Sequence, residues 1–161
     1  MTQDRPPKSV KYLMPDTRLA ALVGRPGGRS REMAIAQADQ QVELLREDYA
    51  KIVDELIGQL ETDAARRDRP PAESLATLQR SADRIITLGG SFNMLFLVEA
   101  AKRLCDLTET FARLGIVDQG SVAVHVHAIR LFGPLSPAIP PEAAADLLAE
   151  LHKVYQHFSE Q

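Results

Sequence analysis

The sequence contains no tryptophan and a single cysteine, and aromatic residues make up only 5% of it. One thiol cannot form an internal disulfide, so the chain has no disulfide framework, which fits a reducing compartment. Because aromatic side chains are scarce, the core must be built from Leu, Ala, Ile and Val. That composition favours helices over sheets.

Long apolar runs and strong net charge are absent as well. The sequence has no apolar run of about eighteen residues, so we expect no membrane-spanning helix. The net charge of −3 gives no reason to expect nucleic-acid binding. The stretch from Met1 to Lys11 is polar and lacks the apolar segment of a secretory signal. We therefore expect a cytoplasmic protein.

Residues 1–30 contain many of the prolines and glycines, which interrupt regular structure. A short helix over Thr17–Val23 is compatible with the pattern, but we expect 1–30 to form a flexible leader. The run from Gly24 to Gly28 has the glycine content of a phosphate-binding loop. No Lys-Ser/Thr pair follows it and no strand pattern precedes it, so a phosphate site is not predicted.

From residue 31 onward, apolar residues recur at helical spacing and predict one all-α domain, 31–161. The first helix is expected to run from Ser30, a good N-cap residue, to about Ala65. Later boundaries are marked by Pro71, which suits a first helical turn, and Gly115, which suits a helix end. The apolar stripe of the first helix consists of Val42, Leu45, Tyr49, Ile52, Leu56 and Leu60.

Four further helices are predicted. Gly89 and Gly90 are expected to end the second helix, Ser91 to cap the third and Asp118 to cap the fourth. The alternation over 122–127 would also fit a strand, but an isolated strand has no partner, so a helix is predicted. We thus expect an antiparallel four-helix bundle with one extra helix. The apolar stripes of these helices include Leu75, Leu78, Ala82 and Ile85; Leu97, Ala101, Leu104, Leu107 and Phe111; Val122, Val126 and Ile129; and Leu151 and Phe158.

The stretch from Ala82 to Leu104 resembles the core motif of histidine phosphotransfer (Hpt) domains. In that family one helix reads approximately Ala-His-x-Leu-Lys/Ala-Gly-Ser-x-x-x-Phe-Gly, and the next reads Leu-x-x-x-Ala-x-x-Leu-Glu. The matching positions are Ala82, Ile85, Phe92, Asn93, Leu97, Ala100, Ala101 and Leu104. Asn93 replaces a glycine, and asparagine also tolerates positive φ. The resemblance covers about residues 72–114 and implies a four-helix bundle of two-component signalling.

Three positions depart from the Hpt motif where it carries its chemistry. Asp83 stands at the phospho-accepting histidine, Ile86 at a basic residue and Thr87 at a small glycine. The imidazole is the nucleophile, the basic residue offsets phosphate charge and the glycine permits close approach of a receiver domain. An aspartate accepts phosphate in receivers beside an acidic Mg²⁺ pocket, which the sequence around Asp83 lacks. We therefore expect no phosphotransfer, no enzymatic activity and no cofactor.

The loss of the histidine does not exclude binding. The receiver-docking face of the family lies around the histidine position, and here that face would carry Asp83, Ile86, Thr87 and Gly90. Two interpretations of Ile86 remain open. It is either an exposed apolar contact within the docking face or a residue that widens the core stripe beside Ile85.

The remaining candidate residues point to no metal or catalytic site. His125 and His127 are two apart, which places them on different sides of a helix, so they are not expected to share a metal. His152 and His157 are also poorly spaced. Cys105 has the acidic neighbours Asp106 and Glu109 in sequence, which raise a thiol pKa, so it is interpreted as a buried filler.

Three functions follow as hypotheses. The first is a non-catalytic adaptor that binds a response-regulator receiver or a histidine kinase domain. The second is an active phosphotransfer protein that uses another histidine, such as His125 or His127. The third is a structural bundle in which the first helix pairs with a second copy. The leader followed by a long helix is also similar to small accessory proteins of bacterial chemotaxis gene clusters, the CheE type.

Overall fold

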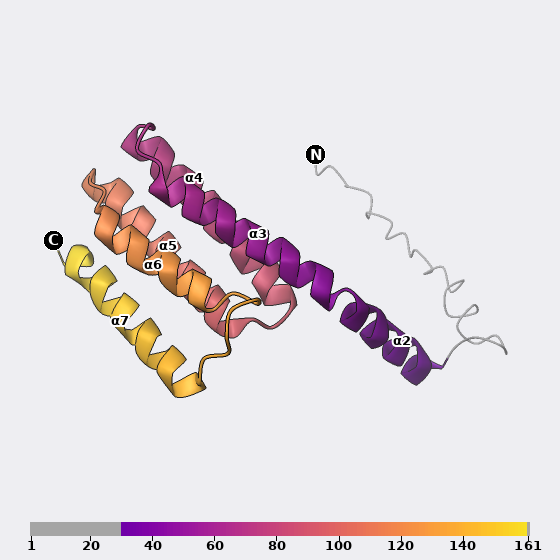
Figure 1. Ribbon diagram of the computed structural model, residues 1–161. Helices are drawn as coiled ribbons and strands as arrows, with labels where there is room; N and C mark the ends of the chain where they lie inside the picture. Colours follow the sequence, from indigo (N-terminus) through magenta and orange to yellow (C-terminus); the bar gives the residue numbers. More distant parts are fainter. Residues whose placement is uncertain (1–29, 161) are drawn as a thin grey trace, which may run out of the picture. The chain divides into compact units, whose positions relative to one another are not determined.

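The computed structural model describes residues 30–160, which contain six helices and no strand (Figure 1). The all-α prediction is therefore confirmed, with one helix more than expected. The predicted leader, including Thr17–Val23 and Gly24 to Gly28, lies outside the described residues except for Ser30. The helices are α2 (Arg31–Leu44), α3 (Arg46–Ala65), α4 (Pro71–Ser91), α5 (Leu95–Leu114), α6 (Gln119–Leu131) and α7 (Pro141–Ser159).

The chain divides into two compact units, residues 1–41 and 42–161. The described residues of the first unit belong to α2, which starts as predicted. The Oγ of Ser30 accepts a hydrogen bond from the backbone N–H of Met33 at 3.2 Å and so satisfies one of the free donors at the helix start. None of the side chains of α2 is buried.

The single helix predicted from Ser30 to Ala65 is wrong, because α2 ends and α3 begins on either side of Leu45. The N–H of Leu45 donates to the carbonyl of Val42, three residues back, instead of four. This tighter turn breaks the α-helical ladder without any proline or glycine to mark it.

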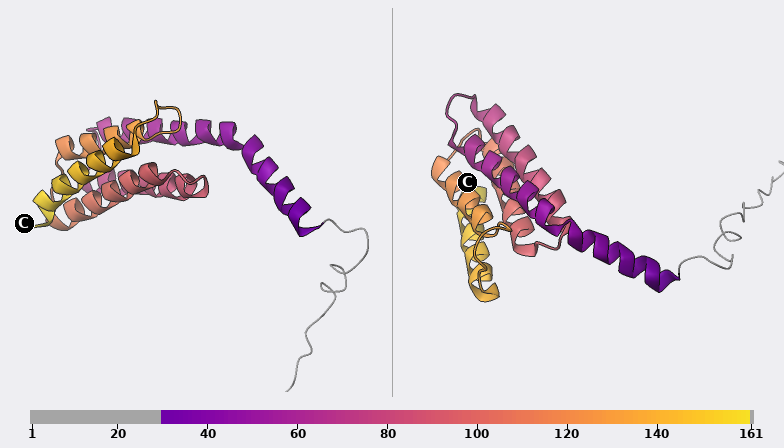
Figure 2. Two further views of the ribbon diagram at one scale, coloured as in Figure 1. Left: turned by 90° about the horizontal axis from the view of Figure 1, so that it is seen from below. Right: turned by 45° about the vertical axis from the view of Figure 1, so that its right-hand side comes forward.

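The second unit is a helical bundle in which α3, α4, α5 and α6 form a closed cycle of neighbours. Helix α3 packs against α4 and α6, and α5 also packs against α4 and α6. Consecutive helices from α3 to α7 run in opposite directions (Figures 1 and 2). Short connections join α3 to α4, α4 to α5 and α5 to α6, whereas residues 132–140 form a longer connection to α7, which packs on α5 and α6. The core is aliphatic, as expected, and its largest fully buried side chains include Phe111, Ile57, Leu60, Ile85, Leu97, Leu104, Leu107, Ile129 and Leu151.

Several helix ends follow the sequence signals. Helix α4 begins at Pro71, and Gly115 ends α5 with a φ of 69°. Asp118 caps α6, since its Oδ2 accepts a hydrogen bond from the N–H of Ser121 at 2.7 Å. Residues 122–127 are helical, so the alternative of a strand there is excluded.

The boundary between α4 and α5 differs from the prediction. Helix α4 continues through Gly89 and Gly90 to its last residue, Ser91, which therefore does not cap α5. The turn consists of residues 92–94, and Asn93 adopts a φ of 57°. Glycine is retained inside α4 because Gly89 is buried against α5.

Helices α3 and α6 are tied together by one arginine. The Nη1 of Arg130 on α6 donates to Asp54 at 2.6 Å, and its Nε and Nη2 donate to the two carboxylate oxygens of Glu61 at 2.9 and 2.6 Å. Both acidic residues are on α3. The guanidinium therefore fixes the position of α6 against α3 with three charge-assisted hydrogen bonds.

Within residues 30–160, no helix combines the length and the apolar character that crossing a bilayer requires.

Candidate functional site

The four residues of the predicted docking face lie on one side of α4, at spacings of three and four residues. Asp83, Thr87 and Gly90 are exposed. Ile86 is half-buried and packs against the hydrophobic core. The structure thus agrees with the interpretation in which Ile86 widens the core stripe, and it leaves Asp83, Thr87 and Gly90 as the exposed row.

Hydroxyl groups in this part of α4 are satisfied by the backbone of their own helix. The Oγ1 of Thr87 donates to the carbonyl of Asp83 at 2.9 Å, and the Oγ of Ser91 donates to that of Thr87 at 3.1 Å. A shallow hollow of about 380 Å³ is lined by Asp83, Arg84, Thr87 and Leu88. Since the Thr87 hydroxyl is occupied, this surface offers a partner one carboxylate, one guanidinium group and otherwise small or apolar contacts.

Asp83 faces the neighbouring helix. The Sγ of Cys105 on α5 lies 3.7 Å from the Oδ1 of Asp83. Partial burial, the charge and hydrogen bond of Asp83, and the charge of Asp106 raise the pKa of the Cys105 thiol to about 12. The prediction of a buried filler is wrong, because Cys105 is only half-buried. The facing carboxylate is a cause of the raised pKa that the sequence did not reveal, because Asp83 is 22 residues away along the chain.

We expect the change Asp83→Asn to make Cys105 more reactive. Removing the facing carboxylate lowers the pKa of the thiol, so the thiolate fraction at pH 8.5 rises and alkylation by iodoacetamide accelerates roughly 3- to 10-fold. Asp106→Asn is the control, because Asp106 contributes least among the causes of the pKa shift. Equal rates in the wild type and the Asp83→Asn variant would show that the two side chains do not interact in solution.

The two histidines of α6 have different environments. His125 is fully buried, and its Nδ1 lies 2.8 Å from the carbonyl of Ser121. Burial lowers the pKa of His125, so its ring is neutral at pH 7 and Nδ1 is the donor. His127 is exposed and lies near Glu61, whose pKa it helps to lower. A buried imidazole is out of reach of a receiver domain, so among these two only His127 is accessible.

No group of three or more His, Cys, Asp or Glu side chains within residues 30–160 is arranged to hold a metal ion.

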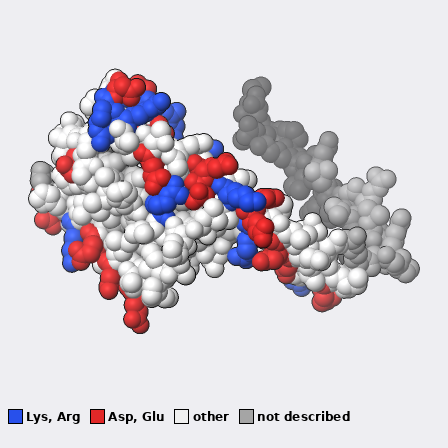
Figure 3. Space-filling model, in the orientation of Figure 1, with Lys and Arg blue, Asp and Glu red and all other residues white. Residues whose placement is uncertain are grey.

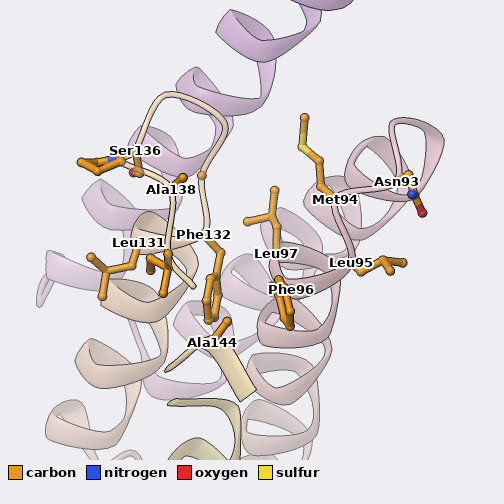
Figure 4. A pocket seen from close by; sticks show the side chains of 13 residues that line it. Asn93, Met94, Leu95, Phe96, Leu97, Leu131, Phe132, Ser136, Ala138 and Ala144 are labelled. Atoms are coloured by element: carbon orange, nitrogen blue, oxygen red, sulfur yellow. The ribbon is translucent and has the colours of Figure 1, made fainter. Parts of the chain in front are cut away.

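A second surface, which the sequence did not indicate, is an apolar pocket of about 300 Å³ between the start of α5 and the connection from α6 to α7 (Figure 4). The rings of Phe96 and Phe132 stack in it with centroids 5.8 Å apart. Leu97 and Ala144 are buried at its base. No titratable side chain lines the pocket, so it can accept an apolar group but supplies no acid or base.

Charge is distributed unevenly over the described surface. Figure 3 shows charged side chains gathered at the turn between α3 and α4 and along α3, whereas the region around α6 and the connection to α7 is largely uncharged. At the turn, Arg69 is paired with Asp63 and Glu73 at 3.4 and 3.9 Å. The acidic partners of Arg69 reduce the net positive charge that this turn presents.

Comparison with protein-family models, with curated proteins and with solved structures found no match to the chain.

Proposed function

We propose that the chain is a non-catalytic adaptor of two-component or chemotaxis signalling in the cytoplasm, an Hpt-like protein that binds a receiver or histidine kinase domain through α4. The observation that carries the proposal is the exposed row formed by Asp83, Thr87 and Gly90. This row occupies the position at which the Hpt motif presents its histidine to a receiver domain.

The arrangement of the helices supports the proposal. The cycle of α3, α4, α5 and α6 is what an antiparallel four-helix bundle of the Hpt type requires. Asn93, which stands at a glycine of the motif, has the positive φ that a glycine there would adopt. Both features are consistent with the register in which Asp83 replaces the histidine.

The surroundings of Asp83 argue against a phosphotransfer reaction. Its side chain accepts a hydrogen bond from a protonated thiol of α5, that of Cys105, and within residues 30–160 it belongs to no cluster of carboxylates able to hold Mg²⁺. The half-buried Ile86 offers no positive charge for a phosphoryl group. A protein of this kind would sequester or scaffold its partner without changing it chemically.

The test is binding of the chain to purified receiver and kinase domains, measured by calorimetry. We expect at least one domain to bind and Thr87→Arg or Gly90→Arg to weaken binding roughly 10-fold or more, because a long charged side chain at the centre of an interface blocks close packing. Ile86→Glu is unsuitable, since it would place a charge against the core.

Ala145→Arg is the matched control. Ala145 is exposed on α7, which does not pack against α4, and the substitution adds the same charge. Binding that is unchanged in both α4 variants would show that α4 is not the docking face. The same conclusion would follow if Ala145→Arg weakened binding as much as the α4 substitutions do.

The main alternative is an active phosphotransfer protein. His127 is the accessible histidine of α6, but the nearby Glu61 carboxylate disfavours a phosphoryl group there. Incubation with a phosphorylated receiver distinguishes the two functions. Acid-labile phosphate that appears on the wild type and is lost in His127→Asn would establish the alternative, and the adaptor proposal expects none.

A further inference from the structure

Apolar residues around the junction of α2 and α3 follow a strict heptad pattern. Within the second unit their spacing alternates between three and four residues over two heptads, which is the spacing of the seam between two paired helices. We call this set the seam: it consists of Val42, Leu45, Tyr49, Ile52 and Leu56. A seam of this kind is narrower than the apolar face of a helix that packs into a globular core.

The bundle covers only the last part of the seam. Leu56 is buried, and Tyr49 is half-buried with its ring centroid 3.6 Å from that of Phe92. By contrast, the exposed fractions of Val42, Leu45 and Ile52 are 49%, 57% and 47%. The core face of α3 is formed instead by Val53, Leu56, Ile57 and Leu60.

Helix α2 is short and exposed. It has 14 residues and none of them is buried, and an isolated helix of that length is marginal in water. The stripes of α4, α5, α6 and α7 are directed into the core, so they do not offer a second seam. A second copy of the chain presents the same seam at the same concentration.

We propose that two copies of this chain pair through the seam and form a homodimer. Both helices then contribute the same residues, which gives a self-complementary interface with two-fold symmetry.

Charges beside the seam permit this pairing. Arg46 is paired with Glu43 at 2.9 Å, and Lys51 with Asp48 at 3.3 Å, within the same stretch of chain. Each pair neutralises itself, so these four side chains add no net charge to the flanks of the seam. The proposal does not depend on the adaptor function, because it involves α2 and α3 and not the exposed row of α4.

The test is the mass of the full chain in solution, measured by sedimentation equilibrium between 1 and 200 μM. We expect a dimer of about 35 kDa, twice the 17.7 kDa of the chain. The double variant Leu45→Glu/Ile52→Glu should raise the dissociation constant at least 100-fold, since four carboxylates would meet in one apolar interface. A wild type that stays monomeric at 200 μM would overturn the proposal.

The control is Val124→Glu/Leu131→Glu. Both side chains are on α6 and are 47% and 48% exposed, close to the 47% of Ile52. The control should remain dimeric. The proposed interface would be contradicted if the seam variant stayed dimeric or if the control became monomeric.

A second measurement excludes misfolding as the cause of a monomeric variant. Leu45→Lys/Ile52→Lys should also be monomeric, and an equimolar mixture with the Glu variant should form a heterodimer because opposite charges then face each other. If the mixture stays monomeric although both variants melt cooperatively, the two seams do not face each other.

Discussion

Replacing Arg130 with methionine is expected to lower the free energy of unfolding by about 2–3 kcal/mol. The side chains of Arg130, Asp54 and Glu61 are each about one-third exposed, so the three hydrogen bonds are partly shielded from water. Methionine keeps much of the apolar volume of the arginine stem but leaves two carboxylates of α3 without their common partner. Urea denaturation followed by circular dichroism measures the change.

Lys153→Met is the matched control for Arg130→Met. Lys153 donates to Glu150 at the same distance, 2.6 Å, but both side chains are about two-thirds exposed. We expect a change within about 0.5 kcal/mol, because water screens exposed pairs. Equal losses of unfolding free energy in the two variants would mean that the link between α3 and α6 contributes no more than an exposed ion pair.

The pH profile provides an independent check of the Arg130 cluster. The hydrogen bond and charge of Arg130 lower the pKa of Glu61 below 4.5 despite a smaller opposing effect of burial. The stabilisation by ionised Glu61 is therefore present above pH 4.5 and is lost as the pH falls through its lowered pKa. In Arg130→Met this part of the acid-induced loss of stability should disappear.

Leucine at position 89 is expected to destabilise the protein by about 1–3 kcal/mol, whereas leucine at position 90 should stabilise it by about 0.5–1 kcal/mol. A Cβ at Gly89 would lie 3.0 Å from Cγ2 of Val98 and 3.6 Å from Cδ2 of Leu97, so a larger side chain must push α4 away from α5. A Cβ at Gly90 meets no atom within 4 Å. Only the general gain in helix propensity over glycine remains there.

The two glycine variants control for each other, since they place the same residue at adjacent positions of one helix. Thermal melting should show transitions displaced in opposite directions, by about 2–4 °C for each kcal/mol. Two shifts of the same sign would show that α4 and α5 do not approach each other as closely at Gly89 as the structure has them.

Local sequence signals predicted the features that depend on a few neighbouring residues. Asp118 caps α6 and Gly115 ends α5 because capping involves atoms no more than a few residues apart. The glycines of α4 show the limit of this reasoning. Gly89 and Gly90 have the same local propensity to end a helix, but the packing of α5 stabilises α4 through both of them.

The candidate site could be predicted only where it depends on local sequence. Helical spacing was sufficient to place Asp83, Thr87 and Gly90 on one exposed face. The half-buried state of Ile86, the facing thiol of Cys105 and the pocket between Phe96 and Phe132 depend on contacts between separate helices. A periodic pattern along one helix contains no information about which other helix lies beside it.

The position of α7 has a consequence for how the protein opens. Among the helices of residues 30–160, α7 packs on α5 and α6 alone, so its detachment breaks no packing of α3 or α4 and leaves the cycle of four helices closed. Local opening free energies are lowest where an element has few neighbours, so amide hydrogens of α7 should exchange with solvent before those of α5. Detachment of α7 would uncover Phe111, whose ring now meets that of Phe158 edge-on at 4.9 Å. The surface that the protein exposes during such fluctuations therefore differs from the one it exposes at rest.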